Sequence, residues 1–378
     1  MSRSINNWIR WWRRLLRRFV SYGDRPHPTP PLAKGREQDL ASPLAKGGLR
    51  GVKQWLLLSL LIIAIASACS STVIERVPTP ASEASLAPCR TVKHAMGETC
   101  IPQNPQRIVT LWMSTFGNTL ALGIKPIATT QSLGEPLPKY LQGKADGVES
   151  VGTLVQPNLE KILLLKPDLI LSMTRPYLEN IYTQLSDIAP TVVMDISTPP
   201  SSWEKHLEDV ASLFDKEQEK KQLIDQYWQR IKQLKQALGV GVASPKENRR
   251  HHLQVSVATV DQNYGIYTYG KKSPIGVVLN DIGLQRPSAQ RGDFFTKSNI
   301  SQENLSEVDG DVLFLSHWGG ESGKEVLEKL KQSPLWQNLK VVQKNRVYFV
   351  DAYNWYGFDV LAMNAVIDDL FKYLVNTP

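Results

Sequence analysis

The sequence lacks the motifs of the common nucleotide-binding and hydrolytic enzymes. It contains no Gly-x-Ser-x-Gly nucleophile motif, no phosphate-binding P-loop and no dinucleotide-binding Gly-x-Gly-x-x-Gly. Its 6 histidines are scattered, and neither a His-x-x-x-His pair nor a Cys/His cluster offers the spacing of a metal site. These absences favour a protein that binds a ligand over one that catalyses a reaction.

Net positive charge is also missing from most of the chain. The full sequence carries +8, but residues 1–53 alone contain 12 Lys/Arg and 3 Asp/Glu, a net of +9. The remainder therefore carries −1. A region this close to neutral has no general affinity for polyanions, so we expect no nucleic-acid partner.

No predominantly apolar run reaches the roughly 20 residues that a membrane-spanning helix needs. The run at residues 55–68 follows the basic residues Arg50 and Lys53 and ends in three small residues at positions 66–68. A positive flank, an apolar middle and a small-residue end are typical of a cleaved export signal. The sequence therefore predicts a protein that works outside the cytoplasm.

Cys69 directly follows this run and leaves two modes of cleavage open. The small residues before it suit ordinary signal cleavage, which would release a soluble secreted protein. Together with Cys69 they resemble a bacterial lipobox, although Ala66 occupies the position where leucine is usual. We predict the lipoprotein, acylated at Cys69 and anchored to the membrane, because the Pro/Ser/Ala-rich residues that follow suit a tether.

Only 3 cysteines are present, and two of them remain after Cys69. Cys89 and Cys100 lie on either side of Gly97, which suits the turn of a small hairpin. Disulfides persist in exported proteins, so we predict a Cys89–Cys100 bridge. The alternative is a pair of free thiols.

After residue 105, short apolar strands alternate with amphipathic helices. The predicted strands are residues 107–111, 169–172, 191–194, 253–259, 312–316 and 346–350. The predicted helices are residues 114–122, 159–165, 177–188, 275–282, 324–331 and 358–375. This alternation implies mostly parallel sheets with helices on both faces.

Residues 201–238 break this alternation. Ser201 and Glu204 form a capping-box pattern at the start of one helix. A second helix, residues 216–238, would be roughly 35 Å long, the span of a small domain. We therefore predict two α/β lobes, joined by these helices. The predicted domains are a leader at 1–68, a tether at 69–88, a first lobe at 89–200, connecting helices at 201–238 and a second lobe at 239–378.

Aromatic residues recur close behind predicted strands. Each is more often a core residue when considered singly, but their repeated placement predicts a ligand site lined by flat side chains. The candidates are Trp112, Tyr177, Tyr264, Phe295, Trp318, Trp355 and Tyr356. Arg175 and Arg291 lie on loops beside such residues and would suit an anionic ligand, although a loop arginine is more often simply solvated.

Residues 159–170, Leu-Glu-Lys-Ile-Leu-Leu-Leu-Lys-Pro-Asp-Leu-Ile, resemble a hallmark of the iron-siderophore and vitamin B12 periplasmic binding proteins. These are the solute-binding subunits of ABC importers. Residues 188–192, 311–314, 334–336 and 346–348 resemble later segments of the family in the same order. The resemblance implies a class III fold, in which two Rossmann-like lobes are bridged by one long helix and the ligand lies between them.

The same resemblance implies one glutamate per lobe that docks on arginines of an inner-membrane ABC permease. The matching positions are Glu160 and Glu303. Residues 89–100 look most like the iron-siderophore branch, which implies a ferric siderophore as ligand. Because a siderophore supplies its own six oxygen ligands to iron, we expect no metal ligands, no cofactor and no catalysis, in a protein that acts as a monomer.

Several alternatives remain. Haem or cobalamin would suit the same fold, with His317, Tyr264 and Tyr356 as candidate axial ligands of haem. A chelatase-like enzyme and a scaffold lipoprotein are alternatives of another class. The sequence leaves the siderophore open among hydroxamate, citrate and catecholate types.

Overall fold

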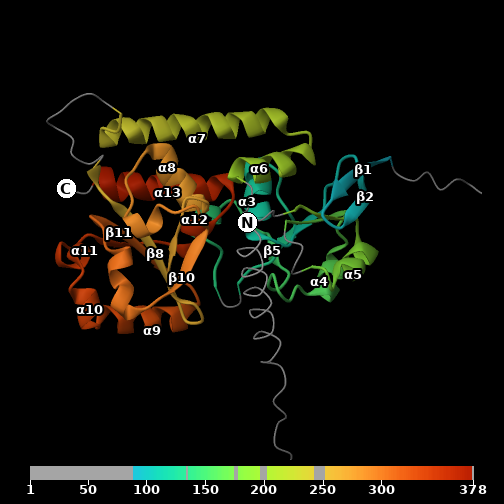
Figure 1. Ribbon diagram of the computed structural model, residues 1–378. Helices are drawn as coiled ribbons and strands as arrows, with labels where there is room; N and C mark the ends of the chain where they lie inside the picture. Colours follow the sequence, from blue (N-terminus) through green and yellow to red (C-terminus); the bar gives the residue numbers. More distant parts are fainter. Residues whose placement is uncertain (1–87, 133–134, 174–177, 196–201, 242–251, 377–378) are drawn as a thin grey trace, which may run out of the picture. The chain divides into compact units, whose positions relative to one another are not determined.

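The computed structural model describes residues 88–132, 135–173, 178–195, 202–241 and 252–376 (Figure 1). All of them belong to one compact unit, Ser82–Pro378. The predicted leader, the export signal, Cys69 and nearly all of the predicted tether lie outside the described residues. No helix among the described residues is long and apolar enough to cross a bilayer.

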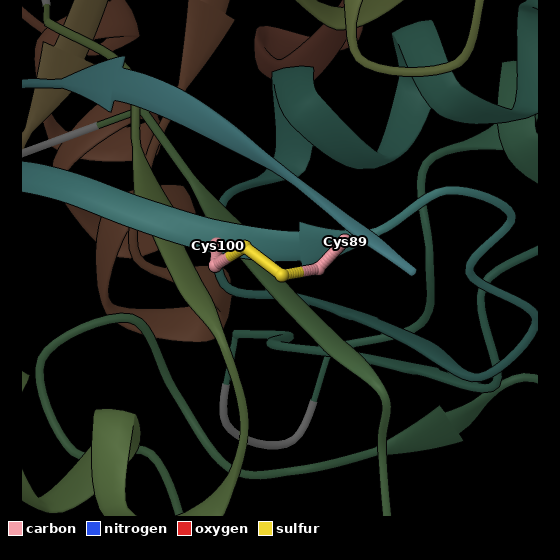
Figure 2. Close-up of a disulfide and its surroundings, with 2 residues drawn as sticks. All are labelled: Cys89 and Cys100. Carbon is pink, nitrogen blue, oxygen red and sulfur yellow. A yellow bond between two sulfur atoms is a disulfide. The ribbon is translucent and has the colours of Figure 1, made fainter. Parts of the chain in front are cut away.

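The described chain opens with an antiparallel hairpin, β1 (Cys89–His94) and β2 (Gly97–Pro102). The turn itself is Ala95 and Met96, and Gly97, which begins β2 directly after it, has φ 131°, a conformation that residues with a side chain rarely adopt. Cys89 and Cys100 form a disulfide with a Cα–Cα distance of 5.6 Å, which confirms the predicted bridge (Figure 2). The amide of Ala95 donates to the carbonyl of Val193 at 2.8 Å, which ties the hairpin to the first lobe.

The first lobe is built on a five-stranded sheet in the order β5-β4-β3-β6-β7. Every pairing in it is parallel, as predicted. The strands are β3 (Ile108–Thr110), β4 (Ala128–Thr129), β5 (Glu149–Ser150), β6 (Leu169–Ser172) and β7 (Thr191–Val193). The helices are α3 (Met113–Ala121), η1 (Lys139–Leu141), α4 (Leu159–Leu165) and α5 (Tyr182–Ile188). The last of these begins later than the predicted residue 177.

Two helices join the lobes, α6 (Trp203–Ser212) and α7 (Glu217–Leu238). The side chain of Ser202 caps α6 by accepting from the amide of Lys205 at 3.3 Å, so the cap lies one residue after the predicted Ser201, which is outside the described residues. A buried stripe on α7 packs into the main hydrophobic core, against α8 (Pro274–Ile282) and α13 (Val360–Leu370) of the second lobe (Figure 1). At 1.5 Å per residue, α7 spans roughly 33 Å, which confirms the predicted long connecting helix.

The second lobe also has a five-stranded sheet, in the order β10-β9-β8-β11-β12. Its strands are β8 (Val255–Asp261), β9 (Gly265–Tyr269), β10 (Thr296–Ile300), β11 (Val312–His317) and β12 (Val347–Phe349). β8, β11 and β12 pair in parallel, but β9 pairs antiparallel with both of its neighbours, β8 and β10. β9 therefore runs opposite to the other four strands, which corrects the expectation of parallel pairing at this side of the sheet.

The cause of this reversal is a tight turn after β8. The carboxylate of Asp261 accepts from the amides of Asn263 and Tyr264 at 2.7 and 3.0 Å, and Gly265 has φ 63°. So short a connection can only join antiparallel strands, because a parallel crossover needs a dozen or more residues.

The helices of the second lobe are α8 (Pro274–Ile282), η3 (Ser288–Gln290), η4 (Gln302–Val308), α9 (Gly320–Lys331), α10 (Pro334–Gln337), α11 (Lys340–Gln343), α12 (Ala352–Tyr356), α13 (Val360–Leu370) and η5 (Phe371–Val375). The predicted closing helix, residues 358–375, begins instead at Val360. Asp359 sets this start, because its carboxylate accepts from the amide of Ala362 at 3.0 Å. The two α/β lobes and their long helix are the fold that the sequence predicted.

Candidate ligand-binding site and docking surfaces

Aromatic rings from three segments of the second lobe meet beside the end of β11. Trp318, which directly follows β11, lies 4.6 Å from Tyr353 and 5.9 Å from Tyr356, measured between ring centroids. Phe295 stacks on Phe358 at 5.7 Å and meets Tyr356 edge-on at 5.9 Å. We call these five residues the aromatic cluster. Since the carboxyl ends of β11 and β12 share one edge of the sheet, the cluster lies where open α/β folds bind ligands.

Three predicted ligand residues, Phe295, Trp318 and Tyr356, therefore come together. All three are half-buried, so each ring packs against its neighbours and still has exposed surface. Tyr353 of α12 and the buried Phe358, neither of them among the predicted ligand residues, complete the cluster. Half-buried, mutually packed rings are suited to contact a flat ligand without much loss of side-chain entropy.

Trp355 does not belong to this surface, and its prediction as a ligand residue is wrong. It is 0% exposed, its ring stacks on Phe314 at 4.4 Å, and its Nε1 donates to Asp369 at 2.8 Å. The predicted loop is a short helix, α12, in which Tyr353 and Tyr356 share one face while Trp355 faces the core.

The remaining predicted ligand residues have mixed positions. Trp112 is half-buried at the N-terminus of α3, and its buried Nε1 has no hydrogen-bond partner among the described residues. Tyr264 is half-buried in the turn after β8, where burial and the nearby Asp261 raise its pKa. Arg291 is exposed, and its Nε donates to the carbonyl of Arg286 at 2.6 Å. Arg175 and Tyr177 lie outside the described residues.

Arg286 is a buried cation that the sequence analysis overlooked. Only 6% of the residue is exposed, and its Nη2 donates to the carbonyl of Tyr269 at 2.6 Å and to Gln290 at 2.9 Å. Its Nε and Nη1 have no partner among the described residues, and burial lowers its pKa to about 10. No sequence signal marks it, because a single arginine before a proline is typical of a loop.

Polar contacts link the aromatic cluster to the first lobe. Tyr353 donates to the carboxylate of Glu135 at 2.7 Å and also shares a hydrogen bond with Ser132. Burial raises the pKa of the Tyr353 hydroxyl, so it remains a donor at neutral pH. His317, the haem candidate, is half-buried beside Trp318, and its Nδ1 has no partner among the described residues.

A second interlobe contact joins a half-buried tyrosine to a fully buried aspartate. The hydroxyl of Tyr140 in the first lobe donates to Asp359 at 3.1 Å. Asp359 is 0% exposed, and desolvation raises the pKa of its carboxyl to about 7, against the hydrogen bonds that it accepts. Gly117 of α3 faces this carboxylate, and a Cβ atom on that glycine would lie 2.5 Å from the carboxyl carbon.

His206 is a second fully buried titratable residue. It is 0% exposed, and burial lowers its pKa to about 4.

The two predicted docking residues are exposed and available. Glu160 lies in the first turn of α4, which Asn158 caps by accepting from the amide of Lys161 at 2.8 Å with its side chain. Lys161 pairs with Glu149 at 3.0 Å instead of with Glu160. Glu303 lies in the first turn of η4. Within the described part of the chain, neither glutamate forms an ion pair with another residue.

The described residues hold no group of three or more His, Cys, Asp or Glu side chains arranged to bind a metal ion. The site consists instead of aromatic surface, hydroxyl groups and arginines. Such groups can hold an anionic ligand by packing and by hydrogen bonds.

Comparison with known proteins places the chain in a family. The sequence profile of the family described as periplasmic binding protein matches residues 108–353. The probable siderophore-binding lipoprotein YfiY of Bacillus subtilis (strain 168) is 34% identical over 85% of this chain and 98% of its own length. The Fe(3+)-citrate-binding protein YfmC of the same strain is 29% identical over 80% of this chain and 90% of its own.

A solved structure is similar over the same region. SirA from Staphylococcus aureus, crystallised in complex with staphyloferrin B, has 27% sequence identity and a TM-score of 0.61, and the match covers 75% of this chain and 98% of SirA. The two lobes and their connecting helix agree with the class III architecture. The profile and the 34% identical relative together show that this chain belongs to the periplasmic binding protein family.

Proposed function

We propose that this protein captures a ferric siderophore outside the cytoplasm and delivers it to a membrane ABC permease. The observation that carries the proposal is the aromatic cluster beside the end of β11, in which four of the five rings are half-buried and which Tyr353 links to the first lobe. The printed names of the relatives support it: a probable siderophore-binding lipoprotein, a ferric-citrate-binding protein and a staphyloferrin B complex.

The chemistry of the proposed site suits a ligand that already holds its iron. Phe295, Trp318 and Tyr356 would pack against the flat or apolar parts of the siderophore. Arg291 and Arg175 would offset its negative charge, and the buried Arg286 would add to the positive potential of this lobe. The protein would then supply neither metal ligands nor a catalytic group, and it would act as a binding protein only.

Delivery would depend on the two exposed glutamates and on the membrane anchor. Glu160 and Glu303 would pair with cationic side chains of the permease, which governs orientation and association rate more than affinity. Acylation at Cys69 would hold the monomer at the outer face of the cell membrane, with residues 69–88 as the tether. The proposed lobes are residues 89–200 and 239–378.

Fluorescence titration of the exported chain tests the proposal directly. Purified protein would be titrated with ferric hydroxamates, ferric citrate, a ferric catecholate, haem and cobalamin, each in metal-loaded and metal-free form where both exist. We expect one ferric siderophore to quench tryptophan fluorescence saturably, because Trp318 lies in the aromatic cluster, and its iron-free form to bind more weakly. Silence across the whole siderophore panel would contradict the proposal.

Haem is the second candidate, and one observation favours it. His317 lies next to Trp318, and its Nδ1 is buried without a partner among the described residues. Binding of haem through this nitrogen would shift the Soret band, and His317→Ala would abolish the shift. A response to haem together with no response to ferric siderophores would transfer the function to haem capture.

A further inference from the structure

Large apolar side chains are exposed at only a few places in the described residues. The six are Val155, Leu163, Leu164, Trp228, Leu335 and Phe349. Four of these six lie on, or packed beside, the two helical segments that carry the exposed glutamates. Single exposed apolar residues need no explanation, but their association with both glutamates does.

On the first lobe, the apolar residues and the glutamate share one face of α4. Glu160, Leu163 and Leu164 stand at positions i, i+3 and i+4, which lie next to one another on a helix surface. Leu163 is 57% exposed and Leu164 is 79% exposed, whereas Ile162 is fully buried in the core of this lobe. Val155, in the turn leading to α4, is 56% exposed. The helix therefore has an inner apolar face and a second, outward apolar face.

The second lobe has a smaller version of this arrangement. Glu303 lies on η4, and the short helix α10 packs against η4. Trp336 of α10 is buried in the same cluster as Leu305 of η4. Its neighbour Leu335 is 44% exposed. On this lobe, too, an exposed leucine lies on a helix that packs against the segment carrying the exposed carboxylate.

We infer that these leucines form the apolar part of the surface that docks on the permease. The inference rests on the proposed function. The partner would be a membrane permease with two contact sites, and each site would present a cationic side chain flanked by apolar side chains. Leu163, Leu164 and Val155 would surround the contact at Glu160, and Leu335 would flank the contact at Glu303.

The glutamates and the leucines would play different roles in docking. The carboxylates steer the approach and set its orientation, because charge acts at a distance and mainly changes the association rate. Leucines around a salt bridge exclude water on contact, which lowers the effective dielectric and strengthens the attraction between the charges. The leucines would therefore lengthen the lifetime of the complex, as truncations at interfaces mostly change dissociation.

A lipid surface is the other occupant to consider, and the charge of the patch disfavours it. Glu160 lies on the same outward face as the two leucines, and anionic lipid headgroups repel carboxylates. The neighbouring Lys161 is paired with Glu149 and does not offset this charge. A cationic protein partner therefore fits the patch better than a membrane does.

Iron uptake by whole cells tests the inference. Cells that lack their own copy of the gene would be supplied with the radiolabelled ferric siderophore that the titration identifies. They would express one of four proteins: wild type, Leu163→Ser/Leu164→Ser, Leu335→Ser or the control Trp228→Ser. Trp228 is 43% exposed on α7, which carries neither glutamate. We expect the double leucine variant to lower the uptake rate at least about fivefold, as truncation at an interface centre does. Ligand affinity, abundance in the membrane fraction and the Trp228→Ser rate should be unchanged.

The outcomes separate the inference from the proposed function. If wild type binds the ligand but supports no uptake, the proposed delivery fails. If Glu160→Ala/Glu303→Ala lowers uptake and the leucine variants do not, docking by the glutamates stands and the inference is overturned. Should the double variant accumulate poorly, Leu164→Gln alone replaces it, because this side chain is the most exposed of the set at 79%.

A vesicle assay decides between permease and lipid. The full chain carrying Cys69→Ser, which cannot be acylated at that position, would be sedimented with vesicles of phosphatidylethanolamine and phosphatidylglycerol. We expect no binding by the Cys69→Ser chain, with or without the leucine substitutions. Binding by the Cys69→Ser chain that the leucine substitutions abolish would assign the patch to lipid and overturn the inference.

Discussion

Asp359 and His206 are both fully buried, and we predict that they oppose each other in the dependence of stability on pH. Desolvation raises the pKa of Asp359 from 3.8 to about 7. Burial lowers the pKa of His206 from 6.5 to about 4. Each group therefore prefers its neutral form in the folded protein, but one group is an acid and the other is a base.

The signs follow from which state binds more protons. Between pH 4 and 6.5 the unfolded chain protonates His206 and the folded chain does not, so stability rises with pH. Between pH 3.8 and 7 the folded chain keeps a proton on Asp359 that the unfolded chain releases, so stability falls as pH rises. The pKa differences correspond to about 3 kcal/mol for His206 and about 4 kcal/mol for Asp359. In the wild type these two contributions nearly cancel.

Asp359→Asn separates them. Asparagine caps a helix about as well as aspartate and can also hydrogen-bond Tyr140, so the substitution removes mainly the charge. We expect the free energy of unfolding at pH 7 to rise by up to about 4 kcal/mol, because the unfolded variant no longer gains free energy by ionising a carboxyl that the folded protein keeps protonated. The His206 contribution should then be visible as a rise of about 3 kcal/mol between pH 4 and 6.5, relative to wild type.

Urea unfolding followed by tryptophan fluorescence at a series of pH values measures these differences. Other carboxylates titrate in the same range, but they are common to all variants and cancel in the comparison. His206→Leu should give the opposite result, a loss of stability as pH rises, and the double variant should remove both contributions. If Asp359→Asn leaves the difference between pH 4.5 and 7 within about 1 kcal/mol of wild type, the reasoning about the buried carboxyl fails.

Three further predictions concern packing, the hairpin and the ligand site. Alanine normally stabilises a helix by about 1 kcal/mol over glycine. Gly117→Ala should instead lower the free energy of unfolding by about 2 kcal/mol, measured in urea, because the new Cβ would lie 2.5 Å from the carboxyl carbon of Asp359. Cys89→Ser/Cys100→Ser should cost about 2–3 kcal/mol, measured in the same way, and a reductant should destabilise wild type but not this variant. Trp318→Ala should weaken siderophore binding about tenfold in the fluorescence or calorimetric titration, whereas Trp355→Phe should lower the melting temperature and leave affinity unchanged. Equal losses of affinity in both tryptophan variants would contradict the assignment of surface and core.

Local sequence signals predicted much of the first lobe. α4 and β6 have the predicted bounds, because Asn158 caps the helix and Pro167 separates it from a continuous apolar strand. The second lobe was harder to predict. β10 alternates polar residues along an edge of the sheet and has no apolar run, so nothing in its composition indicated a strand.

The candidate site was also predictable in part from local sequence signals. Trp318 and Tyr356 follow parallel strands, and the carboxyl ends of such strands meet at one edge, so their proximity could be anticipated. Trp355 was misassigned because a single helical turn directs neighbouring residues to opposite sides. Contacts such as Tyr353 with Glu135, or Val360 with Asn118, join residues more than 200 positions apart and depend on how the lobes pack, which no local pattern encodes.

These interlobe contacts also indicate where the protein is able to move when it binds its ligand. The amides of Phe358 and Val360 donate to Ser114 and Asn118 at 3.1 Å in both cases, and both bonds are buried. Separating the lobes there would leave buried polar groups unpaired, at a cost of about 1–3 kcal/mol for each group. Tyr353, by contrast, bonds to Ser132 and Glu135 at positions that are exposed or half-buried, where water can replace the lost partner. Movement that admits a ligand to the aromatic cluster should therefore break the Tyr353 contacts and keep the buried contacts of Phe358 and Val360 with α3. The buried contacts would then act as the hinge, and the lobes would open on the side of Tyr353.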